Sequence, residues 1–413
     1  MIEFVPTNMA HGGAAIGRVD GKAHFVDGAM PGERVRGEIV QDKKAWARVM
    51  LDEVVEESPL RVSPPCRHFE LCGGCQWQFA DYSAQLEWKQ SIVAGQLGNL
   101  GGLVDPPVGQ TVAPGPEYGY RNRMDFSVQD GAPALTQRKS HTLVPIAECL
   151  LLTPALVGVF ENLKDLGEAR SVTLRSSTVS GEILAVIRGP VPDGAADWGC
   201  LVSRRDRTGV HPVIGSGEIH ETVAGANLRI TGDAFFQTNT PGAETLVALV
   251  GEALEPQAGE TLLDAYAGGG LFSVTVGRTA GAVIAVEANG LGVFDLRHNL
   301  SEVGIDQGGE ELSRRVLHRR GLGCCRSRSP QRGATRARSS GRYGRRTSRH
   351  RLCLLRSSLI GQGCWPHGRC GVSAGSGDPG RPVPADLPHR DGGAVCPQVS
   401  HRPQAVGEAN SHR

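Results

Sequence analysis

The chain has 413 residues, of which 39% are hydrophobic, and its formal net charge at pH 7 is +1. This length allows two or three domains with ordinary cores. We find no signal peptide and no long apolar run, so we expect no membrane association and a cytoplasmic protein, in which disulfides are rare. The charge is unevenly distributed, because every lysine lies at or before Lys164 whereas positions 314–356 hold fifteen arginines and no acid.

Residues 1 to about 60 are predicted to form a small β domain. The segments KAHFVDG, RVRGEIV and AWARVMLDEVV alternate in polarity and are separated by turn residues, which indicates a compact barrel. Its basic residues fit contact with RNA phosphates, and a solvated charged face explains them equally well. These residues are Lys22, Arg34, Arg36, Lys43, Lys44 and Arg48.

Four cysteines predict a metal site. Cys66, Cys72 and Cys75 form the pattern C-x5-C-x2-C within PPCRHFELCGGCQWQ, and Cys149 lies far along the chain. Thiolates spaced in this way on a glycine-rich backbone can converge on one soft ion or on an iron-sulfur cluster. The uneven spacing and the distant fourth thiolate favour a 4Fe-4S cluster. A structural zinc site, a disulfide framework and packed reduced cysteines are the alternatives.

The next part of the chain predicts a helix followed by strands. From Asp81, the segment DYSAQLEWKQSIVAGQLGNL has a helical apolar rhythm that ends at Gly101 and Gly102. Residues 115 to about 225 alternate short strands with turns and include YGYRNRMDFSV. Arg121 and Arg123 of this segment could face RNA from a strand, although the same alternation is common on any half-buried sheet.

From residue 261 the sequence indicates the first half of a nucleotide-binding α/β unit. An apolar strand runs into Asp264, a turn with Gly268 and Gly270 opens a helix, and a second strand ends in Glu287. The glycines allow close approach of the backbone to a ligand, and the acid can accept hydrogen bonds from ribose hydroxyls. AYAGGG lacks the spacing of the dinucleotide fingerprint, so S-adenosylmethionine fits better than NAD. The alternative is a turn whose glycines serve packing only.

Together these segments resemble the RNA uracil-5-methyltransferase family that carries an N-terminal TRAM domain and an iron-sulfur cluster. The resemblance covers residues 1 to about 305 and rests on GGAAIGRVDGKAHFVDGAMPGERVRGEI, CRHFELCGGCQWQFADYSAQLEWK, YRNRMDF, FFQTNTPGAETL and LLDAYAGGG. It implies that the four cysteines hold a 4Fe-4S cluster and that Gln237, Tyr266 and Glu287 line the cofactor site. The role of Gln237 rests on the resemblance alone. The resemblance also implies an RNA substrate, ribosomal in preference to transfer RNA.

The expected fold class is α+β with several domains. We expect an OB-like TRAM barrel for binding RNA at residues 1–60 and a central α/β RNA-binding domain with the iron-sulfur loop at 61–225. Residues 226–310 would begin a Rossmann-like class I methyltransferase domain, and residues 311–413 would be an irregular, poorly structured tail. A monomer is the expected assembly.

The chemistry that the resemblance implies needs three further segments after Glu287. In this family a cysteine thiolate adds to C6 of uracil, C5 then attacks the methyl group of S-adenosylmethionine, and a base removes the C5 proton. The base to be methylated must first be extruded from its stack. A D-P-P-R turn, an S-C-D-P segment and a C-terminal H-V-E carry these steps, and none of them is present.

The residues in their place suggest coding DNA translated out of frame. If the frame is advanced by one nucleotide, RLCLLRSSLIGQG at 351–363 can be read as VYVSCDPASLARD, and RSPQRGA from Arg328 permits DPPR. We therefore expect a frame break between about residues 305 and 320, a sheet truncated after two strands, no catalytic residue and no methyltransferase activity. A real Arg/Ser-rich tail that binds RNA through its charge is the alternative.

Other functions remain as alternatives, among them an electron-transfer protein, which would require a surface for a redox partner. A non-catalytic RNA-binding iron-sulfur protein would not need S-adenosylmethionine, and a tRNA uracil-5-methyltransferase would differ only in substrate. A radical S-adenosylmethionine enzyme would need a C-x3-C-x2-C loop, which this chain does not have.

Overall fold

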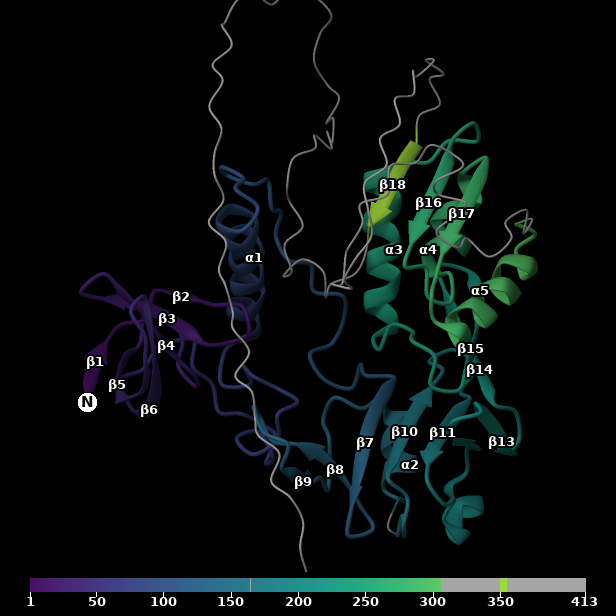
Figure 1. Ribbon diagram of the computed structural model, residues 1–413, viewed down its shortest axis with the longest axis horizontal. Helices are drawn as coiled ribbons and strands as arrows, with labels where there is room; N and C mark the ends of the chain where they lie inside the picture. Colours follow the sequence, from purple (N-terminus) through teal and green to yellow (C-terminus); the bar gives the residue numbers. More distant parts are fainter. Residues whose placement is uncertain (164, 306–349, 355–413) are drawn as a thin grey trace, which may run out of the picture. The chain divides into compact units, whose positions relative to one another are not determined.

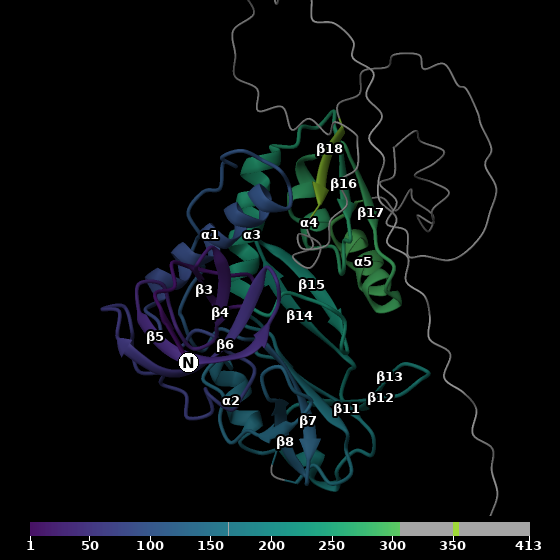
Figure 2. The ribbon, with the colours of Figure 1, turned by 60° about the vertical axis from the view of Figure 1, so that its left-hand side comes forward.

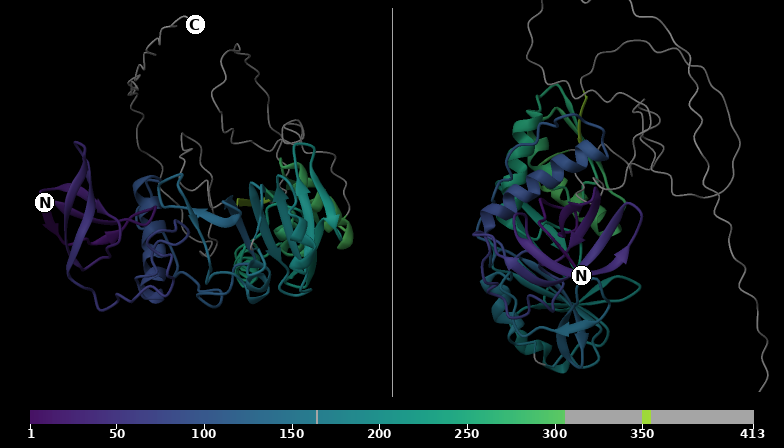
Figure 3. Two further views of the ribbon diagram at one scale, coloured as in Figure 1. Left: turned by 90° about the horizontal axis from the view of Figure 1, so that it is seen from below. Right: turned by 90° about the vertical axis from the view of Figure 1, so that its left-hand side faces the viewer.

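The computed structural model describes residues 1–163, 165–305 and 350–354. Residues 2–56 form one six-stranded sheet in the order β1-β5-β6-β4-β3-β2, drawn in purple in Figure 3. Its strands are β1 (Ile2–Phe4), β2 (Asn8–Met9), β3 (Ala15–Val19), β4 (Lys22–Val26), β5 (Arg34–Asp42) and β6 (Trp46–Glu56). Val26, Met30 and Val35 are fully buried in its core. The predicted small β domain is therefore confirmed as a sheet, and its identity as a TRAM barrel stays a prediction.

The helix predicted from Asp81 is confirmed as α1 (Tyr82–Asn99). The Asp81 carboxylate accepts a hydrogen bond from the Ser83 backbone N–H at 2.9 Å, which satisfies a donor that the first turn leaves free. Ala84 and Trp88 are the buried residues of the helix, and the ring of Trp88 meets that of Trp77 edge to face. This contact packs the helix against the segment that follows the cysteine loop.

A seven-stranded sheet occupies residues 123–214 in the order β13-β12-β11-β10-β7-β8-β9 (Figure 1). Its strands are β7 (Arg123–Gln129), β8 (Ala132–Thr136), β9 (Leu143–Pro145), β10 (Ser171–Ser176), β11 (Ile183–Arg188), β12 (Leu201–Arg205) and β13 (Val210–Ile214). The helix α2 (Pro154–Phe160) and the 3-10 helix η1 (Asp193–Trp198) contribute Leu156, Phe160 and Trp198 to the same core as Phe126 and Leu174. The strands expected between 115 and 225 are thus present.

The remaining elements build the glycine-rich end of the chain. The hairpin β14 (Glu218–Val223) and β15 (Ala226–Thr231) is followed by α3 (Thr240–Leu254). A strand, a glycine turn and short helices then lead into the second strand, as β16 (Thr261–Ala265), α4 (Leu271–Val274), η2 (Val276–Thr279), β17 (Ala282–Val286) and α5 (Gly290–Glu302). Figure 2 shows α5 next to β17 and the β14-β15 hairpin. The predicted half of a nucleotide-binding unit is confirmed as a fold.

The expected truncation of this sheet after two strands is wrong. The strand β18 (His350–Leu354) pairs in parallel with β16, so the sheet has the order β17-β16-β18. The physical reason is that the open edge of β16 presents a row of backbone donors and acceptors that any extended segment can pair with. The expectation that residues 311–413 are irregular throughout therefore fails at β18, and the rest of that expectation lies outside the described residues. None of the helices in the described residues is long and apolar enough to span a membrane.

Candidate functional site

The turn after β16 is held by a buried carboxylate. Asp264 is 3% exposed, and its Oδ2 accepts hydrogen bonds from the Ser273 backbone N–H at 3.0 Å and from the Ser273 hydroxyl at 2.7 Å. Burial raises the pKa of Asp264, and the two hydrogen bonds from Ser273 oppose this shift. Tyr266, Gly268 and Gly270 all have positive φ, so the backbone between β16 and α4 folds into a tight loop.

The predicted acid closes this loop. Glu287 follows β17, and its Oε2 accepts a hydrogen bond from the Gly268 N–H at 2.8 Å. Its Oε1 accepts from the backbone N–H groups of Ala288 and Asn289, both at 2.7 Å. An ionised carboxylate has about four acceptor positions, so it can accept a further bond from a ligand hydroxyl. The structure thus brings Tyr266, Gly268 and Glu287 together at one turn, and their role in cofactor binding stays a prediction.

Gln237 lies on a neighbouring segment. It is half-buried, and the segment meets the glycine turn through Phe235, whose Cδ1 would be 3.9 Å from a Cβ placed on Gly268. Phe235 is itself 69% exposed. Its aromatic face is therefore available beside the turn.

Two positioning residues on α5 escaped the sequence reasoning. Asn299 is fully buried, and its Nδ2 donates to the Gly269 carbonyl at 2.8 Å and to the Arg229 carbonyl at 3.2 Å. Asp295 accepts hydrogen bonds from the Thr231 N–H at 2.8 Å and the Thr231 hydroxyl at 2.6 Å. Together they tie the glycine turn to β15. Their spacing of four residues, which puts both on one helix face, is the signal that could have revealed them.

The four predicted cysteines line one cavity of about 260 Å³. The cavity is also lined by Gln78 and Arg121, and Cys66, Cys72, Cys75, Cys149 and Cys200 are all free thiols. Burial raises the pKa of Cys75 and of Cys149, and neighbouring thiolates raise both pKa values further. Among the described residues, no group of three or more His, Cys, Asp or Glu side chains is arranged to hold a metal ion.

Gly73, between Cys72 and Cys75, has a structural reason. A Cβ on Gly73 would lie 2.8 Å from the Thr136 carbonyl oxygen and 2.9 Å from the Arg138 nitrogen, so only glycine lets the loop lie against the end of β8. The Gly73 N–H donates to that same carbonyl at 2.9 Å. The loop is therefore fixed by the central sheet.

Most of the basic residues expected to contact RNA are paired within the chain. In the first sheet, Arg36 bridges Glu3 at 3.1 Å and Glu53 at 2.9 Å, and three others also form ion pairs. These are Lys22 with Asp42, Arg34 with Glu56 and Arg48 with Asp27. The Arg121 Nε donates to the Arg123 carbonyl at 2.9 Å, and Arg123 likewise makes contacts within the chain. Four of the six basic residues that the sequence suggested for phosphate contact in residues 1–60 are therefore engaged in ion pairs.

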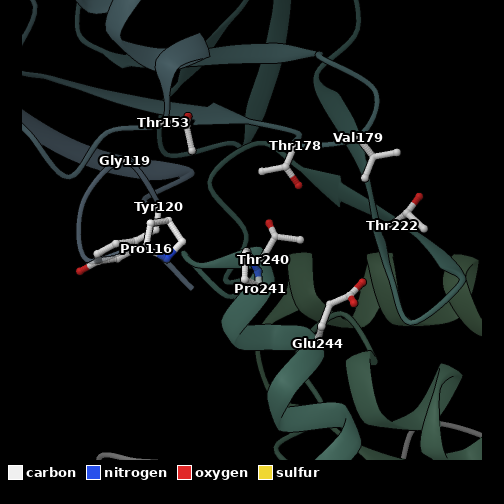
Figure 4. Close-up of a pocket in the computed structure, with 10 residues that line it drawn as sticks. All are labelled: Pro116, Gly119, Tyr120, Thr153, Thr178, Val179, Thr222, Thr240, Pro241 and Glu244. Carbon is white, nitrogen blue, oxygen red and sulfur yellow. The ribbon is translucent and has the colours of Figure 1, made fainter. Parts of the chain in front are cut away.

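A second cavity, of about 370 Å³, lies against the first turn of α3 (Figure 4). Tyr120, Thr178 and Thr240 are among its lining residues. The buried Glu221 accepts hydrogen bonds from the hydroxyls of Thr178 at 3.1 Å and of Thr240 at 2.9 Å. These two hydroxyls are therefore already engaged in the cavity wall.

Two parallel strands joined through a glycine turn, with an acid after the second strand, have the arrangement of a nucleotide-binding α/β unit. No family model matches the chain. An uncharacterized RNA methyltransferase of Gloeobacter violaceus is 32% identical over 342 residues, which cover 73% of this chain and 75% of that protein. One from Streptomyces avermitilis is 31% identical and covers 76% of this chain and 78% of its own. The chain belongs to the RNA methyltransferase family.

Two further relatives have more specific names. The 23S rRNA (uracil(1939)-C(5))-methyltransferase of Methylococcus capsulatus is 30% identical, over 72% of this chain and 73% of that protein. The structure is similar to the tRNA (uracil-54, C5)-methyltransferase of Pyrococcus abyssi in complex with S-adenosyl-L-homocysteine, with a TM-score of 0.58 and 24% identity. That likeness covers 76% of this chain and 79% of the other, and it shows a shared fold.

Proposed function

We propose that the reaction of this protein is methyl transfer from S-adenosylmethionine to C5 of uracil in RNA. The observation that carries the proposal is the glycine turn closed by Glu287, in a chain that is 30% identical to a uracil-C5 methyltransferase. A turn of this kind suits a nucleoside cofactor without pyrophosphate. The carboxylate of Glu287 would accept the ribose hydroxyls, while Gly268 and Gly270 let the backbone approach the ligand. Tyr266 and Gln237 would line the same site.

The cavity with four cysteines is proposed to hold a 4Fe-4S cluster. All four donors are thiols, which suits both zinc and iron-sulfur chemistry. The uneven spacing of Cys66, Cys72 and Cys75 and the distant Cys149, all of which line one cavity, support the iron-sulfur cluster. When bound, the cluster would supply a structural cross-link between the loop at residues 66–75 and Cys149.

The cluster proposal is tested by analysis of iron and acid-labile sulfide in protein purified without air. We expect Cys149→Ser to lose the cluster, because it removes one of four ligands. Cys200→Ser is the matched control, since Cys200 is a free thiol outside that cavity whose burial raises its pKa to about 11. Equal iron content in both variants would refute the assignment, and one equivalent of zinc would establish the alternative metal.

Ribosomal RNA is proposed as the substrate in preference to transfer RNA. The relative named for 23S rRNA reaches 30% identity over most of both chains, whereas the tRNA enzyme supports the fold alone. The N-terminal sheet would act as a TRAM-type RNA-binding domain. We also propose that the protein is a monomer and lies in the cytoplasm.

The activity of the chain as written is a separate hypothesis. The segments that would encode D-P-P-R and S-C-D-P in the shifted frame fall on residues 328–363, most of which lie outside the described residues. The hypothesis that the chain lacks a nucleophile and a base therefore stays a prediction. The shifted frame places the catalytic cysteine across Leu355 and Arg356, so Cys353 is not proposed as the nucleophile.

Release of tritium from RNA labelled at uridine C5 tests both statements. We expect no release by the chain as written and S-adenosylmethionine-dependent release by the protein translated from the restored frame. Release by the chain as written would overturn the inactivity hypothesis. No release by either protein, with no S-adenosylmethionine binding in calorimetry, would favour the non-catalytic RNA-binding alternative.

A further inference from the structure

Two arginines on adjacent strands meet at one carbonyl next to the cofactor site. Arg123 on β7 and Arg175 on β10 are paired in the sheet register. The Arg123 Nη1 donates to the Ala234 carbonyl at 3.0 Å and to the Asp233 carbonyl at 3.2 Å, and the Arg175 Nη2 donates to the Ala234 carbonyl at 2.7 Å. We propose that Arg123, supported by Arg175, is a positioning residue that holds residues 233–239 against the glycine turn for cofactor binding. The inference rests on the proposed binding of S-adenosylmethionine.

Asn122, the residue just before β7, fixes the far end of residues 233–239. The Asn122 N–H donates to the Thr238 carbonyl at 2.9 Å, and the Asn122 Nδ2 donates to the Thr240 hydroxyl at 2.9 Å. Only residues 235–237 lie between the anchored carbonyls of Ala234 and Thr238. These three include Phe235, which meets the glycine turn, and Gln237. A short span anchored at both ends has few accessible conformations, so the anchors set where its side chains point.

The geometry argues against Arg123 as an RNA contact. Its side chain is only 15% exposed, and its Nη2 forms an ion pair with Asp125 at 2.9 Å. A phosphate could be reached only by giving up the bonds to residues 233 and 234. Arg175 is 2% exposed, and although burial lowers its pKa to about 9 it remains a cation at neutral pH. Hydrogen bonds from charged donors are roughly twice as strong as neutral ones, which suits an anchor.

The test compares variants of the full chain by calorimetry with S-adenosylmethionine. We expect Arg123→Gln to weaken binding about tenfold, because the shorter glutamine side chain cannot reach the two carbonyls that the Arg123 Nη1 contacts and carries no charge. Arg123→Lys keeps one charged donor and should recover binding to within about threefold of the unchanged protein. Arg204→Gln is the matched control, since Arg204 lies in the same sheet, is 52% exposed and pairs with Asp206. It should leave the affinity unchanged.

A second measurement separates positioning from RNA contact. Filter binding to an oligouridylate should show equal affinities for the unchanged protein and Arg123→Gln. A loss of oligouridylate binding with unchanged S-adenosylmethionine affinity would overturn the inference. Equal cofactor affinities of the unchanged protein, Arg123→Gln and Arg204→Gln would also overturn it.

Folding and the proposed function are checked independently. Without cofactor, the melting temperature of Arg123→Lys should match that of Arg204→Gln. S-adenosylmethionine should then raise the melting temperature of Arg123→Lys by less than it raises that of Arg204→Gln. If the unchanged protein bound no S-adenosylmethionine, the proposed function itself would fail. A loss of S-adenosylmethionine affinity that is confined to the Arg123 variants, and that lysine partly rescues, is specific to the positioning role. If Arg123→Lys lost stability and cofactor affinity together, with no rescue relative to Arg123→Gln, the inference would be refuted.

Discussion

Replacement of Gly270 by alanine should destabilise the protein more than the same change at Gly268, although both glycines lie in one turn. Gly270 has φ +94°, and an added methyl group would lie 2.7 Å from Leu296 Cδ1. Left-handed backbone costs an L-residue about 1–2 kcal/mol, and overpacking costs a further 1–3 kcal/mol or so. The expected loss of unfolding free energy is therefore about 2–5 kcal/mol. Gly268 has φ +57° and its nearest neighbour would be Phe235 at 3.9 Å, so only the backbone cost of about 1–2 kcal/mol applies there.

Urea denaturation of the unchanged protein, Gly268→Ala and Gly270→Ala, followed by tryptophan fluorescence, measures these differences in unfolding free energy. Gly290→Ala serves as the control, because nothing lies within 4 Å of the added methyl group and Gly290 begins α5. This change should stabilise the protein by about 0.4–1 kcal/mol through the unfolded state. If Gly270→Ala were no more destabilising than Gly268→Ala, the predicted clash between the added methyl group and Leu296 would be refuted.

Two further substitutions test the contacts around the turn. Asn299→Ala should lower the unfolding free energy by about 1–3 kcal/mol, because it leaves the half-buried Gly269 carbonyl and the Arg229 N–H without their partner; an unchanged urea midpoint would contradict this. Asp264→Asn should change the pH dependence of stability. Burial raises the folded pKa of Asp264 above its unfolded value of about 3.9, so the ionised group is unfavourable in the folded state and the unchanged protein loses stability as pH rises through that interval. The melting temperature of Asp264→Asn relative to the unchanged protein should therefore increase from about pH 3 to about pH 7, and parallel melting curves over this range would refute the assignment.

The sequence predicted the elements that local signals control. The helix from Asp81 follows from its helical apolar rhythm, and the glycine turn with Glu287 follows from backbone requirements of a few neighbouring residues. The cap that the Asp81 carboxylate provides was found in the structure. Arg123 shows where local reasoning stops, because alternation along a strand does not say whether an arginine meets solvent or another segment. Its partners Asp233 and Ala234 lie about a hundred residues away in the chain.

The pairing of β18 was also beyond the sequence. Strand pairing depends on which edge of a sheet is open in the folded chain. The sequence of the pairing segment does not show which edge that will be. Asn299 is a similar case, because its role depends on a hydrogen bond to the carbonyl of Gly269, which lies thirty residues earlier in the chain. Such contacts exist only once the tertiary structure brings the two segments together.

The bond from the Gly268 N–H to Glu287 joins two groups of the protein itself, so it holds the loop in shape without a contact from a nucleoside. Little conformational entropy is then lost when the cofactor binds, so most of the contact energy is available as affinity. Entry of the cofactor should accordingly be a single-step encounter, whose rate rises linearly with cofactor concentration and shows no plateau from a slow rearrangement.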